Sequence, residues 1–600
     1  MRDGRAEGAV LGALGVDVNP LVIAGGVGKS IDPLLGDLYP VAEAQLLSYR
    51  RLQIPGVVEY CSHLLSPPFS CPGARDRTSL QSKHEGPGWR NNGAAPIIAV
   101  VTRGGTARGL LADCGLDPAR VPLCAGDLGP AQHPALAWAR SGAMQLTGRA
   151  EGAPQLAPGP LALCADGAAA ALRALAPGCL DELNGAALLG ERAACAQLSR
   201  RGPLSAGGSC RLLPCSDGWL AVNLARSDDL AALAAWLQLE TAPPSSTASA
   251  WPLLEHELDH RSCGPLLERA ELLGLPVSRV TRPAAIAPPW IRFAQGITTL
   301  NGATLNGATL NGATLNGTTL NGLALDRPTL AANPPLVVDL SSLWAGPLCA
   351  QLLADCGARV IKVESTRRPD GARQGPPRFY DLLNHGKQSV ALDFADDGDL
   401  ALLRSLLEVA DVVVENSRPR ALEQLGISAG ELLLRRPGLL WIAITGHGRE
   451  SGRVAFGDDA GAAAGLCPWV DGDHPAKNDD GEQQQPLFCG DAVADPLAGL
   501  HAAVATVALR RAGRGGLVDL SLASVAAHCV GATANAADCC ADIEVSRCAD
   551  GWQVVVDDQR ALVAPAQARS NGRRAATLGH DTPAVRAWLA NSGATESTCS

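Results

Sequence analysis

Two aspartates in the last fifth of the sequence have a spacing and a setting that could carry chemistry. Asp491 and Asp495 lie four residues apart, and Asp495 directly precedes Pro496. The alanine-rich segment that follows predicts a long helix from about 497 to 511. A carboxylate at a helix N-terminus can also be a simple cap that satisfies free N–H groups. The residues alone leave both roles open.

A metal-binding pattern occurs in the first half of the chain, at His256-Glu257-Leu258-Asp259-His260. This segment fits HExxH, which on a helix places two imidazoles on one face for zinc and adds a glutamate base. The residues that follow, 261–264, supply no third ligand at a useful spacing. Leu253 and Leu254 instead indicate an ordinary amphipathic helix. We interpret the pattern as a chance match and predict no metal site.

The Gly-rich run at 21–28, followed by Lys29-Ser30, resembles a phosphate-binding loop only superficially. The GxxxxGK[ST] pattern requires glycine at position 23, and the sequence has Ile23 there. We therefore interpret this run as a turn after a short apolar segment.

Composition and charge exclude several functional classes. The 600 residues are 46% apolar and 18% charged, which is enough to bury cores in more than one domain. The net charge is −10, and only five of the 50 basic residues are lysines, so a polybasic nucleic-acid or membrane-surface protein is excluded. The sequence shows no apolar run long enough to span a membrane and no secretory start. With 19 scattered cysteines and no CxxC pair, we expect a cytoplasmic protein with reduced thiols.

The second half of the chain alternates apolar strands with helical segments. Short loops between them predict a parallel sheet with right-handed crossovers, an open α/β nucleotide-binding architecture without the GxGxxG fingerprint. Helices are predicted at 348–356, 399–409 and 428–435. The predicted strands are Leu336–Leu340, Arg359–Glu364, Ser389–Phe394, Asp411–Glu415 and Leu439–Thr445.

The first half has a weaker pattern. A strand is predicted at 96–102 and a helix at Thr106–Cys114, and Cys210–Leu224 is typical of a hairpin. Further helices are predicted at 228–238, 251–260 and 264–273. Residues 299–322 repeat Asn-Gly-Ala-Thr-Leu about five times, too few for a solenoid, so we interpret them as a linker.

Residues 336–373 (LVVDLSSLWAGPLCAQLLADCGARVIKVESTRRPDGAR) resemble the opening of the family III CoA-transferases. That group includes formyl-CoA and carnitine CoA-transferases and the related α-methylacyl-CoA racemases. The resemblance implies an α/β fold with an open parallel sheet and a smaller α+β domain. It continues through NHGKQSVALDF at 384–394, ADVVVENSRPRALEQLGI at 410–427, TGHG at 445–448, DPLAG at 495–499, VDLSL at 518–522 and LGHDT at 578–582.

The first half resembles the same family more faintly, through SGAMQLTG at 141–148 and DGWLAV at 217–222. At the position that matches Asp495, it has Leu163, which cannot be a nucleophile. We therefore expect one working site per chain. The expected organisation is an N-terminal extension at 1–95, a degenerate first half at 96–295 with a small domain at about 205–290, a repeat linker at 296–333 and a catalytic half at 334–600.

The resemblance implies nucleophilic catalysis by Asp495. Its carboxylate would attack an acyl-CoA thioester, and an enzyme-bound aspartyl-CoA thioester would pass CoA to an acceptor carboxylic acid. Coenzyme A is then a substrate, and no metal is needed. The alternatives are an acyl-CoA racemase of the same family and a non-catalytic CoA-binding protein. Family members usually form interlocked homodimers, although a duplicated chain could pair its own halves instead.

The resemblance also implies which residues contact CoA. The loop after the first strand of the second half would lie next to the nucleotide, and a basic residue would meet a phosphate. For Arg373 and Lys387, solvent-exposed ion pairing is the alternative. The residues implied are Leu343, Trp344, Ala345, Arg373, Lys387, Asn416 and Arg418.

The sequence departs from the family pattern in three places. The ENFRPG loop has Ser417 and Arg420 here, so an aromatic contact is missing. The small domain of the second half is cut to roughly 545–575, and we expect the one in the first half to take its place. Racemases use a histidine before the aspartate, where this chain has Gly457-Asp458-Asp459. Acyl transfer is therefore favoured over racemisation.

Overall fold

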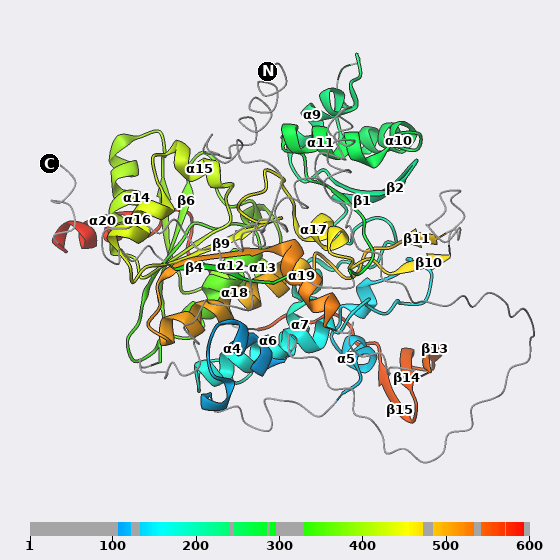
Figure 1. The fold of residues 1–600 in the computed structure, drawn as a ribbon, viewed down its shortest axis with the longest axis horizontal. Helices are drawn as coiled ribbons and strands as arrows, with labels where there is room; N and C mark the ends of the chain where they lie inside the picture. Colours follow the sequence, from blue (N-terminus) through cyan, green and yellow to red (C-terminus); the bar gives the residue numbers. More distant parts are fainter. Residues whose placement is uncertain are drawn as a thin grey trace, which may run out of the picture. The chain divides into compact units, whose positions relative to one another are not determined.

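The second half of the chain supplies six strands of a seven-stranded sheet, as its strand–helix alternation predicts (Figure 1). In the computed structural model the strand order is β4-β12-β9-β8-β5-β6-β7. Neighbouring strands are parallel except at the edge, where β4 runs antiparallel to β12. The strands are β4 (Arg292–Gln295), β5 (Leu336–Asp339), β6 (Arg359–Ser365), β7 (Gln388–Leu392), β8 (Val412–Glu415), β9 (Leu440–Thr445) and β12 (Gly516–Ser521). The expected α/β fold with a parallel sheet is confirmed.

The structure describes residues 106–121, 132–240, 242, 244–284, 288–295, 329–471, 484–532, 542–570 and 572–592. All of them belong to one structural unit that spans Ala94–Ser600. The Gly-rich run before Lys29, the strand predicted at 96–102 and the pentapeptide repeats at 299–322 lie outside the described residues.

Both faces of the sheet are covered by helices, because successive strand residues point to opposite sides. Val337 packs into one apolar cluster and Val338 into the other. One face packs against α14 (Asp397–Val409), α16 (Ala429–Arg435) and α20 (Thr582–Asn591). The other face packs against α12 (Ala345–Asp355) and α18 (Ala494–Arg511).

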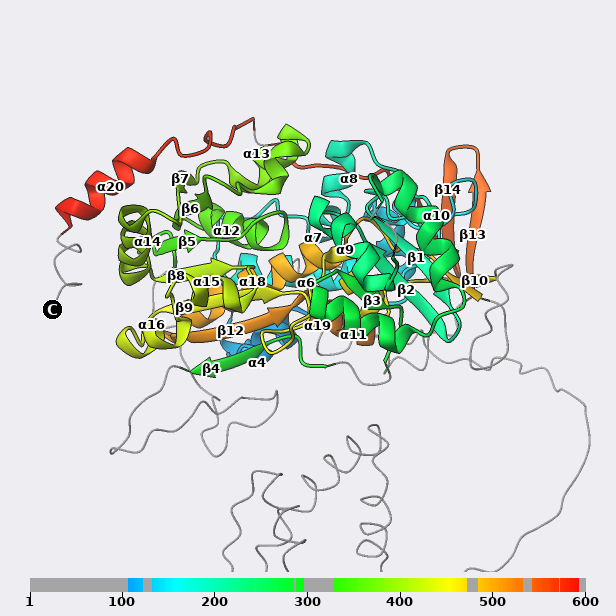
Figure 2. The ribbon, with the colours of Figure 1, turned by 90° about the horizontal axis from the view of Figure 1, so that it is seen from above.

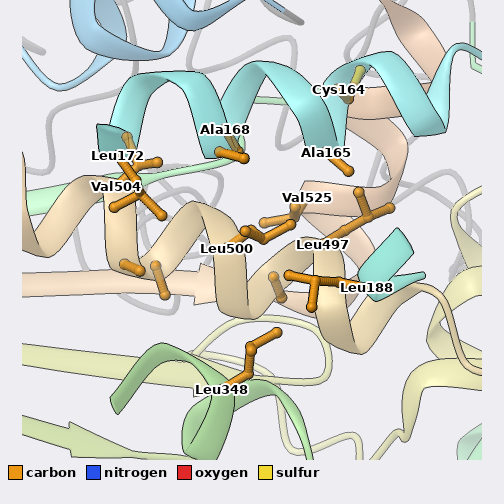
Figure 3. Close-up of a cluster of buried hydrophobic side chains, with 14 of the residues drawn as sticks. Cys164, Ala165, Ala168, Leu172, Leu188, Leu348, Leu497, Leu500, Val504 and Val525 are labelled. Carbon is orange, nitrogen blue, oxygen red and sulfur yellow. The ribbon is translucent and has the colours of Figure 1, made fainter. Parts of the chain in front are cut away.

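Helix α18 is the central element of the larger core. It packs against α12 on one side and against α6 (Leu161–Leu175) and α19 (Leu522–Gly531) on the other (Figure 3). Its many alanines keep the helices close, and Gly499 is needed for this approach. A Cβ atom at Gly499 would lie only 2.7 Å from the Ala345 carbonyl oxygen. The DPLAG segment therefore brings the start of α18 next to the loop that follows β5.

Within the described residues, the first half adds helices and one edge strand, β4, to the sheet of the second half (Figure 2). The segment expected to form its small domain folds into the antiparallel sheet β1-β2-β3, against which three helices pack. Besides α6 and β4, the helices and strands described in the first half are α4 (Ala107–Asp113), η4 (Pro118–Arg120), α5 (Pro134–Arg140), η6 (Met144–Leu146), α7 (Gly185–Leu188), α8 (Glu191–Ala196), β1 (Cys210–Cys215), β2 (Gly218–Asn223), α9 (Ser227–Leu237), α10 (Thr247–Leu258), α11 (Cys263–Leu273) and β3 (Val277–Arg279).

The remaining elements connect the strands or lie near the C-terminus. The segment expected to hold a shortened small domain forms a three-stranded antiparallel meander, which contacts α5. No helix among the described residues is long and apolar enough to cross a membrane. These elements are η7 (Gly371–Gln374), α13 (Pro377–Asn384), α15 (Pro419–Gln424), α17 (Gly457–Ala463), β10 (Trp469–Asp471), β11 (Gln484–Pro486), β13 (Ile543–Cys548), β14 (Gly551–Val556) and β15 (Gln559–Leu562).

Candidate active site

Asp495 lies in the first turn of α18, and its half-buried carboxylate rests against the backbone of Gly457. A Cβ atom at Gly457 would lie 2.1 Å from Asp495 Oδ2, so no side chain fits at this position. The Gly457 N–H, at the start of α17, donates a hydrogen bond to the Asp495 carboxylate. The glycine therefore leaves one face of a potential nucleophile in contact with a backbone donor.

The turn that precedes Asp495 is held in a strained conformation. Ala492 has φ +47°, which is unfavourable for a residue with a Cβ atom, and Gly490 has φ +67°. The Ala492 N–H donates to Asp458 Oδ1 at 3.0 Å, and the Gly490 N–H donates to Thr147 Oγ1 at 2.8 Å. These contacts fix the turn, and the second of them comes from the first half of the chain.

Arg192 lies close to three carboxylates and is bound to one of them. From helix α8, it donates to Asp491 through Nε at 2.9 Å and through Nη2 at 2.5 Å, a bidentate pair with a fully buried carboxylate. Burial opposes the charge of Arg192, but Asp491, Asp458 and Asp495 outweigh this effect and raise its pKa. The guanidinium therefore remains protonated and neutralises only part of the negative charge around it.

Burial raises the pKa of Asp495 to about 7, well above the usual range of an aspartate. Arg192 opposes this shift, whereas the charges of Asp458 and Asp491 add to it. Burial and the charge of Asp491 likewise raise the pKa of Asp458 to about 6. Perturbed carboxylates of this kind concentrate at functional sites, where a group must change its protonation near neutral pH.

The small domain of the first half supports the same site from a second direction. Asn223, at the end of β2, donates from Nδ2 to Asp459 Oδ1 at 3.1 Å. Ser278, in β3, donates to Asp459 Oδ2 at 3.4 Å. Burial raises the pKa of Asp459 to about 7. These bonds orient α17, whose first residue is the glycine that contacts Asp495.

The loop after β5 carries three of the residues for which the family resemblance implies a CoA contact. Leu343 has φ +73° and a side chain that is 40% exposed, an arrangement that is costly for leucine. The Trp344 ring is buried, with its edge against Phe379 and the Arg192 guanidinium 5.5 Å from its centre. The buried Trp344 Nε1 has no hydrogen-bond partner among the described residues. Arg192, which lies over the Trp344 ring and binds Asp491, links this ring to the carboxylate cluster. Ala345 is buried as the first residue of α12.

Lys387 is buried rather than exposed to solvent, so the alternative of solvent-exposed ion pairing is wrong for this residue. Its Nζ pairs with Asp339 Oδ2 at 2.9 Å and donates to the Pro347 carbonyl oxygen at 2.9 Å. Lys362, also buried, pairs with Asp370 Oδ2 at 3.0 Å and donates to the Ser341 carbonyl oxygen at 2.7 Å. Together these ion pairs tie the loops after β5 and β6 to the sheet.

Substituting Lys387 with methionine should destabilise the protein by about 3–5 kcal/mol, because it leaves the buried Asp339 carboxylate short of a partner. Urea unfolding measures this difference. The matched control is Arg367→Met, which removes a largely exposed pair with Asp393 and should cost at most about 1 kcal/mol. Equal losses for the two variants would contradict a structural role for the buried pair.

Three further sequence candidates lie on loops at the carboxyl ends of β6 and β8. Arg373 is bound to Glu364 through Nε at 2.9 Å and Nη2 at 2.6 Å, and it stacks 4.5 Å over Tyr380. Asn416 bridges the loop after β5, since it accepts from Ser342 N at 3.0 Å and donates to Ser342 O at 2.7 Å. Both side chains thus organise the loops that surround the site.

Arg418 is exposed, with its guanidinium partly buried, and it is surrounded by other arginines. Burial of its guanidinium and the charges of Arg226, Arg368 and Arg420 lower its pKa, although Asp229 opposes the shift. Its Nη2 donates to the Gly274 carbonyl oxygen at 3.2 Å, as Arg226 Nη2 does at 2.9 Å. Arg226 comes from the small domain of the first half. Arg226 is already paired with Asp229, so Arg418, Arg368 and Arg420 provide the uncompensated positive charge, which is suited to phosphate.

The structure therefore brings together Asp495, Asp491 and the Trp344 loop, and it adds residues that sequence reasoning missed. Arg192 and Asp491 are 299 positions apart, so no local pattern could connect them. His256 and His260 lie elsewhere, on the exposed side of α10 and beyond its last residue. Leu163 lies in α6, in the helix layer against α18.

Comparisons with known proteins find sequence similarity in the second half of the chain. The family model of CoA-transferase family III matches residues 335–555. A succinyl-CoA–D-citramalate CoA-transferase of Chloroflexus aurantiacus is 33% identical over 208 residues, which cover 33% of this chain and 50% of that protein. A succinate–glutarate CoA-transferase of Agrobacterium fabrum is 33% identical over 215 residues, or 32% of this chain and 52% of that protein.

A solved CAIB/BAIF family protein from Brucella suis aligns at 26% identity, covering 38% of this chain and 66% of that chain, with a TM-score of 0.32. The matched region spans about half the length of the two CoA-transferases from Chloroflexus aurantiacus and Agrobacterium fabrum. The resemblance to the family is confirmed for the part of the second half that contains Asp495. The division into two family-like halves stays a prediction.

Proposed function

We propose that the protein moves CoA from an acyl-CoA to a carboxylic acid through Asp495, since residues 335–555 match the family model of CoA-transferase family III. The observation that carries the proposal is the setting of this carboxylate. It is half-buried, its pKa is raised to about 7, and it contacts the Gly457 N–H next to a strained turn. A cap on a solvent-exposed helix would need none of these features.

The reaction has two stages, and each stage consists of two successive attacks on a carbonyl carbon. The ionised Asp495 attacks the thioester carbonyl, the C–S bond breaks, and CoA thiolate leaves a mixed anhydride. The thiolate then attacks the aspartyl carbonyl, which releases the original acid and leaves CoA bound to Asp495 as a thioester. The acceptor carboxylate attacks this thioester to form a second anhydride. Thiolate attack on the acceptor carbonyl releases the new acyl-CoA and regenerates the Asp495 carboxylate.

Backbone and side-chain donors around Asp495 support these steps. The Gly457 N–H contacts the carboxylate, so it can stabilise negative charge on the aspartyl oxygen in the tetrahedral states. Arg192 holds Asp491 and lowers the pKa of Asp495, which keeps more of the nucleophile ionised at neutral pH.

CoA would be bound by the loops at the carboxyl ends of β5, β6 and β8. Arg418, with Arg368 and Arg420, provides positive charge for the phosphates. Leu343, Trp344 and Ala345 would contact the nucleotide part, and Asn416 holds their loop in place. Arg373 and Lys387 would not bind CoA directly, because they are already paired with Glu364 and Asp339. They would instead hold the CoA-binding loops in place.

The first half would then complete the site instead of forming a second one. Residues 96–295 supply Arg192, Thr147 and Asn223, and the 334–600 half supplies the nucleophile. We propose that the chain pairs its own halves in this way and has one working centre. Leucine at position 163 is consistent with this proposal, because an aliphatic side chain cannot attack a thioester.

The rate should depend on pH through Asp495. Because only the ionised carboxylate attacks, kcat/KM should rise with pH and level off above about pH 7. Asp458→Asn removes a neighbouring negative charge, which lowers the pKa of Asp495 and moves the midpoint to lower pH. Asp393→Asn, at a remote and partly exposed site, should leave the midpoint unchanged. A flat profile between about pH 5 and 9, or an upward shift in Asp458→Asn, would refute this account.

Incubation of purified protein with a panel of acyl-CoA donors and isotopically labelled carboxylic acids tests the function itself. CoA transfer predicts that label appears in new acyl-CoA. The alternative, an acid–base racemase, is favoured by one observation. Asp458 and Asp495 both have raised pKa values, so one could remove a proton and the other supply one. Deuterium incorporation at the α-carbon without acyl exchange would support that alternative. CoA binding with neither reaction would indicate a non-catalytic protein.

A further inference from the structure

The first turn of α17 contacts the candidate nucleophile on one side. Gly457, the first residue of this helix, donates its N–H to the Asp495 carboxylate. The Asp459 carboxylate, in the same turn, is fully buried and accepts a hydrogen bond from the Phe456 N–H at 2.9 Å. Residues 456 and 459 therefore enclose Gly457, and their position determines where its N–H points.

The other side of this turn contacts the β1-β2-β3 sheet, which comes from the first half of the chain. Asn223, the last residue of β2, donates from Nδ2 to Asp459 Oδ1 at 3.1 Å. Ser278, in β3, donates from Oγ to Asp459 Oδ2 at 3.4 Å. All three residues are buried, so the loss of either donor would leave a buried carboxylate less well satisfied. The sheet therefore helps to fix the first turn of α17.

Two residues that follow β9 hold the Ser278 hydroxyl in place. Its Oγ lies 3.3 Å from His447 Nε2 and accepts from Arg453 Nη2 at 3.4 Å. A guanidinium can only donate, so the hydroxyl proton remains for Asp459 or His447. Burial and the charge of Arg453 lower the pKa of His447 to about 4, which keeps this ring neutral at neutral pH. The contacts of Ser278 thus join the sheet, the loop after β9 and α17.

We propose that Asn223 and Ser278 are positioning residues for CoA transfer, which act through Asp459 to hold the Gly457 N–H against the reacting carboxylate. The inference rests on the proposed function, and it gives the first half a contribution to the site besides Arg192. Negative charge develops on the aspartyl oxygen in the tetrahedral states, and a backbone donor stabilises it only within hydrogen-bond distance. A small displacement of the turn therefore slows the reaction without weakening the binding of CoA.

Asn223→Ala and Ser278→Ala test this role, because each removes one donor to Asp459 and changes no formal charge. Each should lower kcat by about tenfold while KM for the acyl-CoA stays within about twofold. Each should also raise the midpoint of the pH profile, since the bond from the Gly457 N–H opposes the rise in the pKa of Asp495. A merely structural role would lower the stability against urea without moving this midpoint.

Thr281→Val is the matched control. Thr281, two residues after β3, donates from Oγ1 to the Ala463 carbonyl oxygen at 2.8 Å, at the opposite end of α17. This substitution removes a bond to the same helix but leaves the contacts of its first turn in place. The kcat should therefore stay within about twofold of the native value, and the pH midpoint should not move.

Transfer assays over a range of pH, with urea unfolding of each variant, separate the possible results. If the native protein transfers CoA and the alanine variants match Thr281→Val in kcat and pH midpoint, the positioning role is overturned while the proposed function stands. A lower midpoint in either alanine variant would overturn it as well. Each alanine variant is a test by itself, so one that fails to fold leaves the other to decide. If the native protein transfers no CoA, the proposed function and this inference both fail.

Discussion

Asp495→Ala is expected to lower kcat for CoA transfer by about 10⁴-fold or more, because the variant has no group that can form the anhydride or hold CoA. Asp495→Asn should be nearly as inactive, although it preserves the shape and the contact with Gly457. Both variants should still bind CoA, because the positive surface around Arg418 is unchanged. Steady-state transfer assays and equilibrium binding of CoA measure the two effects separately.

Asp166→Asn is the matched control for this substitution. Asp166 lies in α6, near the first-half position that matches Asp495, and it accepts a hydrogen bond from Ala186 N at 2.8 Å. An asparagine can accept the same bond, so activity should stay close to that of the native protein. Measurable transfer by Asp495→Ala would overturn the role of this residue, and a large loss in Asp166→Asn would show that the first half has a site of its own.

Arg192→Met is expected to have the second largest effect, a fall in kcat/KM of about 10²–10³-fold. Asp491 would remain buried without its bidentate partner, and the pKa of Asp495 would rise further once the opposing charge is removed. The midpoint of the pH profile should therefore move above about pH 7. Unfolding should also become easier, by about 3–5 kcal/mol.

The control for Arg192 comes from the neighbouring residue in the same helix. Glu191 pairs with Arg569 at 2.8 Å and, like Arg192, connects the first half of the chain to the second. Arg569→Met should lower the stability while leaving the pH midpoint in place. Arg192→Lys should recover part of the lost activity. If both methionine variants behave alike in the pH profile, Arg192 has only a structural role.

The sequence was most informative where the pattern of apolar residues determines the structure locally. Strands such as β8 are buried on both faces, and the run Val412–Val414 is wholly apolar, so the parallel sheet could be predicted closely. Boundaries were less certain where side chains outside the apolar pattern set them. Helix α10 begins at Thr247 instead of 251, because Ser246 caps it with Ser249.

The candidate site was only partly predictable, because long-range contacts complete it. Asp495 and Trp344 stood out through a resemblance of ordered motifs, and the structure places their segments near each other through α12 and α18. Arg192 and Asn223 come from the other half of the chain, in segments without a distinctive pattern. The burial of Lys387 also could not be foreseen, since its partner Asp339 is 48 residues away.

Identification of the covalent intermediate tests the central claim most directly. Protein incubated with an acyl-CoA donor is treated with hydroxylamine, which converts an aspartyl-CoA thioester to a hydroxamate, and its peptides are then analysed by mass spectrometry. The account predicts a hydroxamate on the peptide that contains Asp495, dependent on the donor and missing from Asp495→Asn. An unmodified Asp495 peptide during active CoA transfer, or a hydroxamate on Asp458 or Asp491 instead, would contradict it.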